Sequence, residues 1–306
     1  MRILVLGAGG VGGYFGGRLA EKGADVTFLV RQQRQQQLEK DGLVIRSVAG
    51  DITLQPKTIT ASDPASAYDL VLFSTKSYHL QSAITDLKPF VGEHTVVLPL
   101  LNGVAHYPIL QEQFGADRVI GGLCFIETTL NQEGHVLHSS PNHYVVFGEF
   151  GQKDTERIRS IEEALSGTKT SFVRSGHIEV DIWHKYLFIA TMAGVTTLMR
   201  APMGPILESG GDEFLLSVLR EIESVMLAHG APLDPDIVNK HMATMGKMSY
   251  EMKSSMQRDM EKGFSIEGDH LHGYLLQIAA DHQIETPLLQ AIYQNLKVYR
   301  VTAGTA

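Results

Sequence analysis

The chain has one cysteine and one tryptophan among its 306 residues, and it has no apolar run long enough to cross a membrane. A single cysteine excludes an internal disulfide framework and a zinc site made of cysteines. The 13 histidines show no spacing typical of metal ligands, so we expect no metal site. Acidic residues outnumber lysine and arginine by 34 to 26, which argues against nucleic acid or an anionic membrane as a partner.

The start of the chain lacks the basic segment followed by an apolar one that marks a secretory signal. The first apolar run already begins at Ile3, which leaves little room for a targeting peptide. We therefore expect a cytoplasmic protein. With 43% hydrophobic residues, a chain of this length can bury a sizeable core in one or two domains.

The most informative feature that is present is a glycine-rich segment near the start. It lies between an apolar run at residues 3–6 and a helix-compatible run that ends at Lys22, and a second apolar run follows at residues 26–30. The segment is Gly7-Ala8-Gly9-Gly10-Val11-Gly12. A G-x-G-x-x-G loop between a strand and a helix is typical of dinucleotide-binding folds, and a merely glycine-rich turn is the alternative.

Each glycine of this motif has a physical reason. Gly7 allows a tight turn off the first strand, Gly9 lets the backbone approach a pyrophosphate, and Gly12 lets the helix pack close to the sheet. The N–H groups at the start of that helix then face the phosphates. We therefore predict that the six residues of the loop bind a dinucleotide.

The second strand is followed by a basic residue, Arg31, with no acidic residue beside it. Folds that bind NAD usually place Asp or Glu there, to accept a hydrogen bond from the ribose 2′-hydroxyl. An arginine instead pairs with a 2′-phosphate, which its guanidinium matches in geometry. The pattern favours NADP(H) over NAD(H), and a solvated arginine at a strand end is the alternative interpretation.

Strand-like and helix-like segments alternate through the first half of the chain, as in a parallel, doubly wound sheet. From Ile178 the pattern becomes long and helical. We therefore predict an α/β fold, with an N-terminal doubly wound domain over residues 1–175 and an all-helical domain over residues 176–306. The apolar faces of the helical domain serve either a homodimer or the core, and the pattern leaves both open.

Two polar residues follow predicted strands, at the edge where such sheets bind ligands. Lys76 follows the apolar strand 70–73 and can steer a phosphate or a carboxylate, with a solvated loop lysine as the alternative. Asn102 follows the strand 95–98, and its amide offers a donor and an acceptor to a nicotinamide ribose or a substrate carbonyl. Asn102-Gly103 is also a common turn dipeptide, so spacing alone leaves both interpretations open.

The helical half contributes a lysine and a glutamate. Lys185 lies early in a predicted helix, residues 178–199, on a face that continues through apolar or small residues to Thr196. A partly desolvated lysine suits general-acid chemistry, and a lysine that snorkels from a helix start is the alternative. Glu267 precedes another helix and either acts in the site or caps that helix. Spacings of three and four predict a helical core stripe of methionines, and an adaptable lid over the substrate is the alternative. The methionines are Met242, Met245, Met248, Met252, Met256 and Met260.

Together these motifs resemble the ketopantoate reductase (2-dehydropantoate 2-reductase) family over nearly the whole chain. The matching segments, in the family's order, are Gly7–Gly12, Arg31, Asp69–Leu72 leading to Lys76, Asn102-Gly103, Trp183-x-Lys185, Ser255, and Glu267-x-Asp269-x-x-x-Gly273. The resemblance implies a Rossmann-type domain followed by a helical substrate domain. It also implies NADPH-dependent reduction of a 2-oxo acid, with ketopantoate and its place in pantothenate biosynthesis as the leading case.

The resemblance implies a role for each matching residue. Lys185 is the expected general acid that protonates the new alkoxide, and Glu267 helps to hold this lysine or the nicotinamide ribose. Ser255 contacts the substrate carboxylate, and Asn102 contacts cofactor and substrate. On the cofactor side, a 2′-phosphate pairs with the arginine that follows the second strand, and the ribose lies near Lys76.

One stretch departs from the family pattern. Family members carry asparagines four and eight residues after the catalytic lysine, where this chain has Ile189 and Ala193. Thr196 matches a family threonine and is a predicted substrate contact, whereas Leu101 stands where a polar residue is common. A site without such amides loses discrimination for a substrate hydroxyl. Two alternatives to a ketopantoate reductase therefore stay open. One is a reductase of a more apolar 2-oxo acid, and the other is an NADP(H)-binding sensor without enzymatic activity.

Overall fold

The computed structural model describes residues 1–303, and its contacts divide the chain into two compact units. The first unit contains residues 1–101 and 106–178. The second contains residues 102–105 and the chain from residue 179 onward. A short loop that follows a strand of the first unit is therefore packed with the helices of the second.

The first unit is built around a five-stranded parallel sheet in the order β5-β2-β1-β6-β7. Its strands are β1 (Arg2–Leu6), β2 (Asp25–Leu29), β5 (Lys57–Ile59), β6 (Tyr68–Phe73) and β7 (Val91–Pro99). The helices of the unit are α1 (Gly10–Glu21), α2 (Gln32–Asp41), α3 (Leu80–Leu87), α4 (His106–Phe114) and α5 (Glu156–Leu165). The central strands are almost wholly apolar, because helices or other sheets cover both faces of a parallel sheet.

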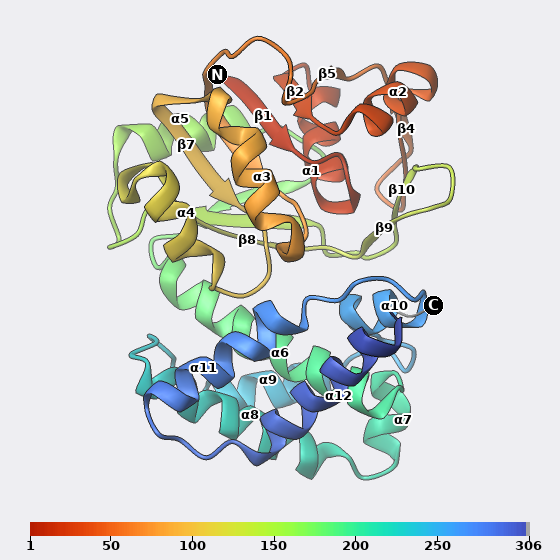
Figure 1. Ribbon diagram of the computed structural model, residues 1–306, viewed down its shortest axis with the longest axis vertical. Helices are drawn as coiled ribbons and strands as arrows, with labels where there is room; N and C mark the ends of the chain where they lie inside the picture. The colour runs from red at the N-terminus through yellow and green to blue at the C-terminus, as the bar shows by residue number, and fades with distance from the viewer. Residues whose placement is uncertain (304–306) are drawn as a thin grey trace. The chain divides into compact units, whose positions relative to one another are not determined.

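The direction of the chain across the sheet reverses beside β1. From β1 it moves outward to β2 and β5, and it then returns to the other side of β1 for β6 and β7. Because parallel crossovers are right-handed, α1 and α3 cover opposite faces, and α3 lies in front of the sheet in Figure 1. The predicted α/β class with a doubly wound sheet is confirmed, and the carboxyl ends of β1 and β6 form its switch point, where such sheets bind ligands.

Two smaller sheets complete the first unit. One has the order β4-β3-β10-β9 and the other β12-β11-β8. Their strands are β3 (Leu43–Ser47), β4 (Ile52–Leu54), β8 (Gly121–Phe125), β9 (Thr128–Leu130), β10 (Val136–His138), β11 (Tyr144–Gly148) and β12 (Ser171–Arg174). Helix α1 packs on β1 and β2 and also on β3 and β10. Its glycines permit this, since a Cβ at Gly16 would lie 2.8 Å from Phe28 and one at Gly17 would lie 2.5 Å from Ile45.

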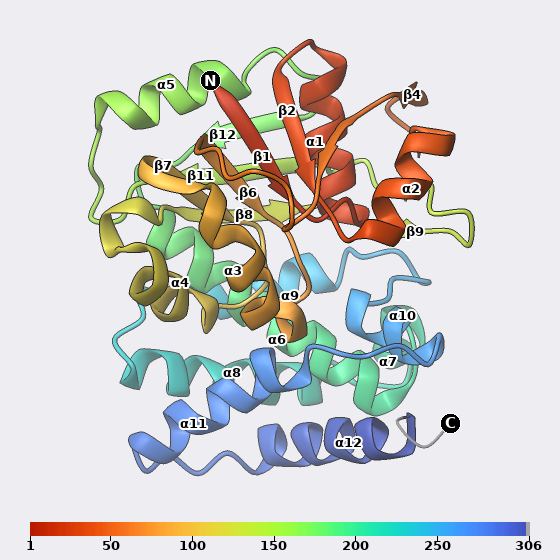
Figure 2. The ribbon, with the colours of Figure 1, turned by 45° about the horizontal axis from the view of Figure 1, so that its top comes forward.

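The second unit is helical (Figure 2). Its helices are α6 (Ile178–Met199), α7 (Met203–Glu208), α8 (Asp212–Ala228), α9 (Ile237–Met245), α10 (Ser255–Glu261), a π-helix (Asp269–Gly273), α11 (Tyr274–Asp281) and α12 (Pro287–Ala303). Helices α9, α11 and α12 all pack against α8. None of the helices within residues 1–303 is long and apolar enough to span a bilayer.

The predicted domain boundary between residues 175 and 176 lies just before the division between the two units. The functions assigned to the two predicted domains remain predictions. Residues 304–306 of the predicted second domain lie outside the described part of the chain.

The prediction of a helical core stripe is wrong for two of the six methionines. Helix α9 ends at Met245 and α10 begins at Ser255, so Met248 and Met252 lie outside both helices. The N-cap of α10 is Ser254, whose hydroxyl accepts the amide of Gln257. An N-cap begins a new helix even where apolar residues recur at helical spacing on both sides of it. Of the six methionines, only Met245 and Met256 are fully buried.

A buried histidine gives the fold a dependence on pH. His272 is 0% exposed, its Nε2–H donates to the Ala190 carbonyl at 2.9 Å, and its Nδ1 has no partner among the described residues. Burial lowers the pKa of His272 from 6.5 to about 4. Between these values the unfolded chain binds a proton that the folded chain does not, so the free energy of unfolding falls as the pH falls, by about 3 kcal/mol at most.

Chemical denaturation between pH 7 and pH 4 measures this loss. The variant His272→Gln keeps an N–H donor and does not titrate, so its stability should depend less steeply on pH. His138 and His241, whose pKa values burial also lowers to about 4, should contribute to the remaining slope. Equal slopes for the wild type and the variant would contradict the assignment to His272.

Candidate functional site

Two positions of the glycine loop, Gly7 and Gly12, can be occupied only by glycine without strain or a steric clash. Gly7 has a φ of +94°, in the left-handed region that favours glycine. A Cβ at Gly12 would lie 2.1 Å from the Gly7 carbonyl oxygen and 2.2 Å from the hydroxyl of Ser74. The start of α1 is thereby pressed against the carboxyl ends of β1 and β6.

Gly9 has open space in front of it. A Cβ at Gly9 would meet no atom within 4 Å, although its neighbours in the loop are tightly packed. Gly9 is the N-cap of α1 and forms no side-chain cap, and the first turn of α1 carries no acidic residue. Beside the loop, the Oγ1 of Thr75 is buried without a hydrogen-bond partner among the described residues. Open space, helix amides and an unsatisfied hydroxyl together fit a bound pyrophosphate.

The two arginines after β2 differ in their contacts. Arg34 donates from Nε and Nη2 to the Ala8 carbonyl at 3.2 and 3.0 Å, and therefore holds the glycine loop. Arg31 is exposed, and its Nη2 lies 3.4 Å from Nδ1 of His79. Arg31 is thus the arginine whose guanidinium can reach a phosphate in solution, at the end of the strand where a 2′-phosphate is expected.

Lys76 stands at the same edge of the sheet. It is half-buried and precedes a 3₁₀ turn at Ser77–His79 that follows β6. The hydroxyl of Ser74, two residues earlier, donates to the Leu6 carbonyl at 2.9 Å and ties the two strand ends together. The structure therefore brings the glycine loop and Lys76 to one switch point.

The remaining candidate residues belong to the second unit. Lys185 lies in the first half of α6 and is only 9% exposed. One and two turns later on the same face come Ile189, which is half-buried, and Ala193, which is 1% exposed. The surroundings of this lysine along α6 are therefore apolar.

Thr196 is fully buried, and its hydroxyl proton already forms a hydrogen bond within α6. Its Oγ1 donates to the Met192 carbonyl at 2.8 Å and lies 2.8 Å from Oγ of Ser254. Because a carbonyl only accepts, Ser254 must donate to Thr196. Ser254 caps α10, so this bond fixes the start of the helix whose first residue is Ser255.

Asn102 and Glu267 lie on two segments that approach each other. A Cβ at Gly103 would lie 3.1 Å from Leu271 and 3.5 Å from the ring of Tyr186, the residue after Lys185. Glu267 is half-buried, and its carbonyl accepts the amide of Leu271 at 3.0 Å. The loop that carries Asn102 is thus packed on the π-helix that follows Glu267 and on the helix that carries Lys185.

Sequence reasoning missed several of these groups. The capping role of Ser254 can be read from its spacing to Gln257, since S-x-x-Q is a capping box, but its bond to Thr196 has no local signal. Thr75 and Arg34 carry no local signal, because their importance comes from contacts with the distant glycine loop.

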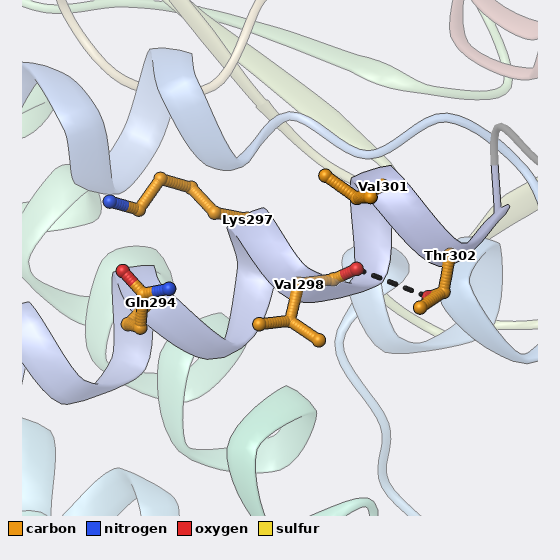
Figure 3. A pocket seen from close by; sticks show the side chains of 5 residues that line it. All are labelled: Gln294, Lys297, Val298, Val301 and Thr302. Carbon is orange, nitrogen blue, oxygen red and sulfur yellow. Dashed lines mark hydrogen bonds between the residues drawn. The ribbon is translucent and has the colours of Figure 1, made fainter.

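Two surface hollows are lined by other residues. Figure 3 shows one on α12, lined by Gln294, Lys297, Val298, Val301 and Thr302. The second is near the start of β7 and includes Arg118 and Arg157. Neither hollow contains a candidate site residue. Among residues 1–303 no cluster of three His, Cys, Asp or Glu side chains could hold a metal ion.

Comparison with known proteins identifies the family of the chain. The model described as "Ketopantoate reductase PanE/ApbA" matches residues 3–152, and the corresponding C-terminal model matches residues 177–300. The chain belongs to the ketopantoate reductase family. It is therefore an oxidoreductase of that family, as the resemblance predicted.

Individual proteins are similar to this chain in sequence or in fold. An uncharacterized oxidoreductase of Bacillus subtilis, YkpB, is 50% identical over 98% of this chain and 99% of its own. The crystal structure of a 2-dehydropantoate 2-reductase from Geobacter metallireducens is 26% identical with a TM-score of 0.88, covering 97% and 99% of the two chains. A ternary structure of D-mandelate dehydrogenase with NADH and anilino(oxo)acetate is 20% identical, with a TM-score of 0.90 over 99% of each chain, and it shows the same fold.

Proposed function

We propose that this chain reduces a 2-oxo acid to the 2-hydroxy acid with NADPH. The observation that carries the proposal is Lys185, a cation that is 9% exposed in the unit that also contains Asn102 and Glu267. A lysine on an apolar helix face is partly desolvated, which suits a group that must give up its proton. When a ketone is reduced, negative charge develops on its oxygen, and an ammonium group beside it stabilises that charge and then donates a proton. Bound NADPH supplies the hydride.

The other residues take the roles that their positions support. The glycine loop and Lys76 bind the dinucleotide, Asn102 binds cofactor and substrate, and Glu267 holds the nicotinamide ribose or Lys185. Ser255 binds the substrate carboxylate. The hydroxyl of Thr196 is buried and already hydrogen-bonded to the Met192 carbonyl and to Ser254. This supports an indirect role, in which Thr196 positions Ser255 by holding the N-cap residue Ser254.

Ketopantoate is the first candidate substrate, because the family supports it, and its product would enter pantothenate biosynthesis. A more apolar 2-oxo acid is the second candidate. It is favoured by the apolar face that follows Lys185, where Ile189 and Ala193 offer no hydrogen bond to a substrate hydroxyl.

Steady-state oxidation of NADPH with a panel of acids separates these candidates. The panel contains ketopantoate, branched aliphatic 2-oxo acids without a hydroxyl, and aromatic 2-oxo acids. A kcat/KM at least about 10-fold higher for ketopantoate supports the first candidate, and the reverse order supports the second. Tight NADPH binding without turnover of any acid would mean that the chain is a sensor and not a reductase.

The choice of cofactor rests on Arg31. We expect Arg31→Ala to weaken NADPH binding roughly 10- to 100-fold and NADH binding less than about two-fold, because a charge-assisted hydrogen bond to the 2′-phosphate is lost. Fluorescence titration with each dinucleotide measures both constants. Lys40→Ala, which removes an exposed charge at the other end of α2, is the control for charge alone. Equal losses for NADPH and NADH in Arg31→Ala would contradict the assignment of NADPH.

A further inference from the structure

A histidine of the π-helix makes a bond across a long stretch of sequence. Nε2 of His270 lies 3.0 Å from the carbonyl oxygen of Asn102, a residue 168 positions away. Because the carbonyl can only accept, Nε2 must carry the proton and donate. Burial lowers the pKa of His270, and the neighbouring charge of Glu267 opposes that shift.

The π-helix is attached on two sides. While His270 bonds to the Asn102 loop, His272 bonds to the Ala190 carbonyl of α6. Tyr186 of α6 adds a third attachment, since its hydroxyl donates to the Leu271 carbonyl at 2.5 Å. Single π-helical turns inside helices recur at functional sites, where the extra residue redirects side chains.

The bond from His270 falls next to a residue whose backbone is constrained. Gly103, directly after Asn102, has a φ of +79°, and a Cβ there would lie 3.5 Å from the His270 ring. With its carbonyl held and the next residue in a left-handed conformation, the Asn102 backbone has little freedom to rotate. The direction of the Cα–Cβ bond of Asn102 is therefore set from the π-helix.

We propose that His270 is a positioning residue, which aligns the Asn102 amide with Lys185 and Glu267 by donating to the Asn102 carbonyl. The inference rests on the proposed function, because the alignment matters for turnover only if the unit binds an oxo acid. His270 touches neither substrate nor cofactor in this role. Its loss should therefore reduce turnover more than it reduces dinucleotide affinity.

A matched pair of variants isolates the donated hydrogen bond. His270→Gln retains an N–H at a similar reach, and His270→Met has a similar length without a donor. His282→Met is the control for loss of a histidine from the same unit, since His282 is exposed and follows α11. Far-UV circular dichroism and thermal unfolding establish that each variant is folded.

Hydrogen–deuterium exchange of the peptide that covers residues 100–106 tests the bond without reference to activity. We expect about five-fold faster exchange of the loop amides in His270→Met and wild-type exchange in His270→Gln and His282→Met. Unchanged exchange in His270→Met overturns the proposal. If His270→Met does not fold, wild-type exchange in His270→Gln supports the proposal, and fast exchange there overturns it.

Kinetics then test the consequence for the reaction. We expect His270→Met to lower kcat/KM for the oxo acid about 10-fold through kcat and to weaken NADPH binding by a smaller factor, with recovery in His270→Gln. Equal damage in the Gln and Met variants would mean a structural role and would overturn the positioning role. If the wild type reduces no oxo acid, the proposed function fails, while the exchange experiment still decides whether His270 holds the loop.

Discussion

Replacing Lys185 with methionine should lower kcat for the oxo acid roughly 10²- to 10⁴-fold. Methionine matches the length of lysine but offers neither a charge nor a proton to the developing alkoxide. Because Lys185 is buried on an apolar face of α6, the methionine should fit the same space, and thermal unfolding establishes that the variant is folded. The affinity for NADPH should also stay within about two-fold of the wild type, since the predicted dinucleotide residues lie mainly in the other unit.

Single-turnover kinetics of NADPH oxidation measure the chemical step, and titration measures cofactor affinity. Lys240→Met is the control, because this exposed lysine of the same unit pairs with Asp234 at 3.1 Å. Lys185→Arg adds a second test: it keeps the charge but cannot give up a proton near neutral pH, so it should be nearly as impaired as methionine. A Lys185→Met variant with turnover close to the wild type would falsify the proton-donor role.

The parts of the fold that could be predicted from sequence are those with a local signal. The strand, glycine loop and helix at residues 2–21 form one short motif in which each position has its own steric reason. The bounds of α6 follow from a long apolar pattern, and the predicted span of residues 178–199 is the observed one. Parallel strands in the first unit follow from their apolar runs and the helices between them.

The parts that could not be predicted depend on distant contacts. Strand β3 pairs in parallel with β10, which lies some 90 residues later, and no periodicity announces such a partner. The methionine pattern was a genuine period of three and four, but the cap at Ser254 overrides it. Likewise, the bonds from Ser254 to Thr196 and from His270 to Asn102 join segments that only the folded chain brings together.

The same limit applies to the candidate site. Residue types and spacing identified Lys185, Asn102 and Glu267 through their resemblance to a family, and their roles remain proposals. What the sequence could not reveal are the contacts that hold the surrounding backbone: the bond from Ser254 to Thr196, and the bond from His270 of the π-helix to the Asn102 loop. A supporting residue is chosen by distance in space, so many residue types can fill its place and no motif marks it.

Two alanine variants of the glycine loop should have opposite effects: one should lower stability, and the other should weaken NADPH binding. Gly12→Ala should lower the free energy of unfolding by about 3 kcal/mol, because its Cβ would lie 2.1 Å from the Gly7 carbonyl oxygen and the backbone there cannot move aside. Gly9→Ala should change that free energy by less than about 1 kcal/mol, because its Cβ meets no protein atom within 4 Å and the φ of Gly9 is −83°.

For NADPH affinity we expect the opposite order: among the variants that fold, Gly9→Ala should lose more affinity than Gly12→Ala. Gly9→Ala should weaken NADPH binding at least about 10-fold, since its methyl group occupies the space through which the backbone approaches the pyrophosphate. Denaturant titration gives the free energies of unfolding, and fluorescence titration gives the NADPH affinities at a temperature where both variants are folded. Wild-type affinity in Gly9→Ala would mean that the open space beside Gly9 is not the pyrophosphate site. A stable Gly12→Ala protein would mean that α1 can move away from the strand ends, and the loop would then not be the rigid cradle that we propose for the phosphates.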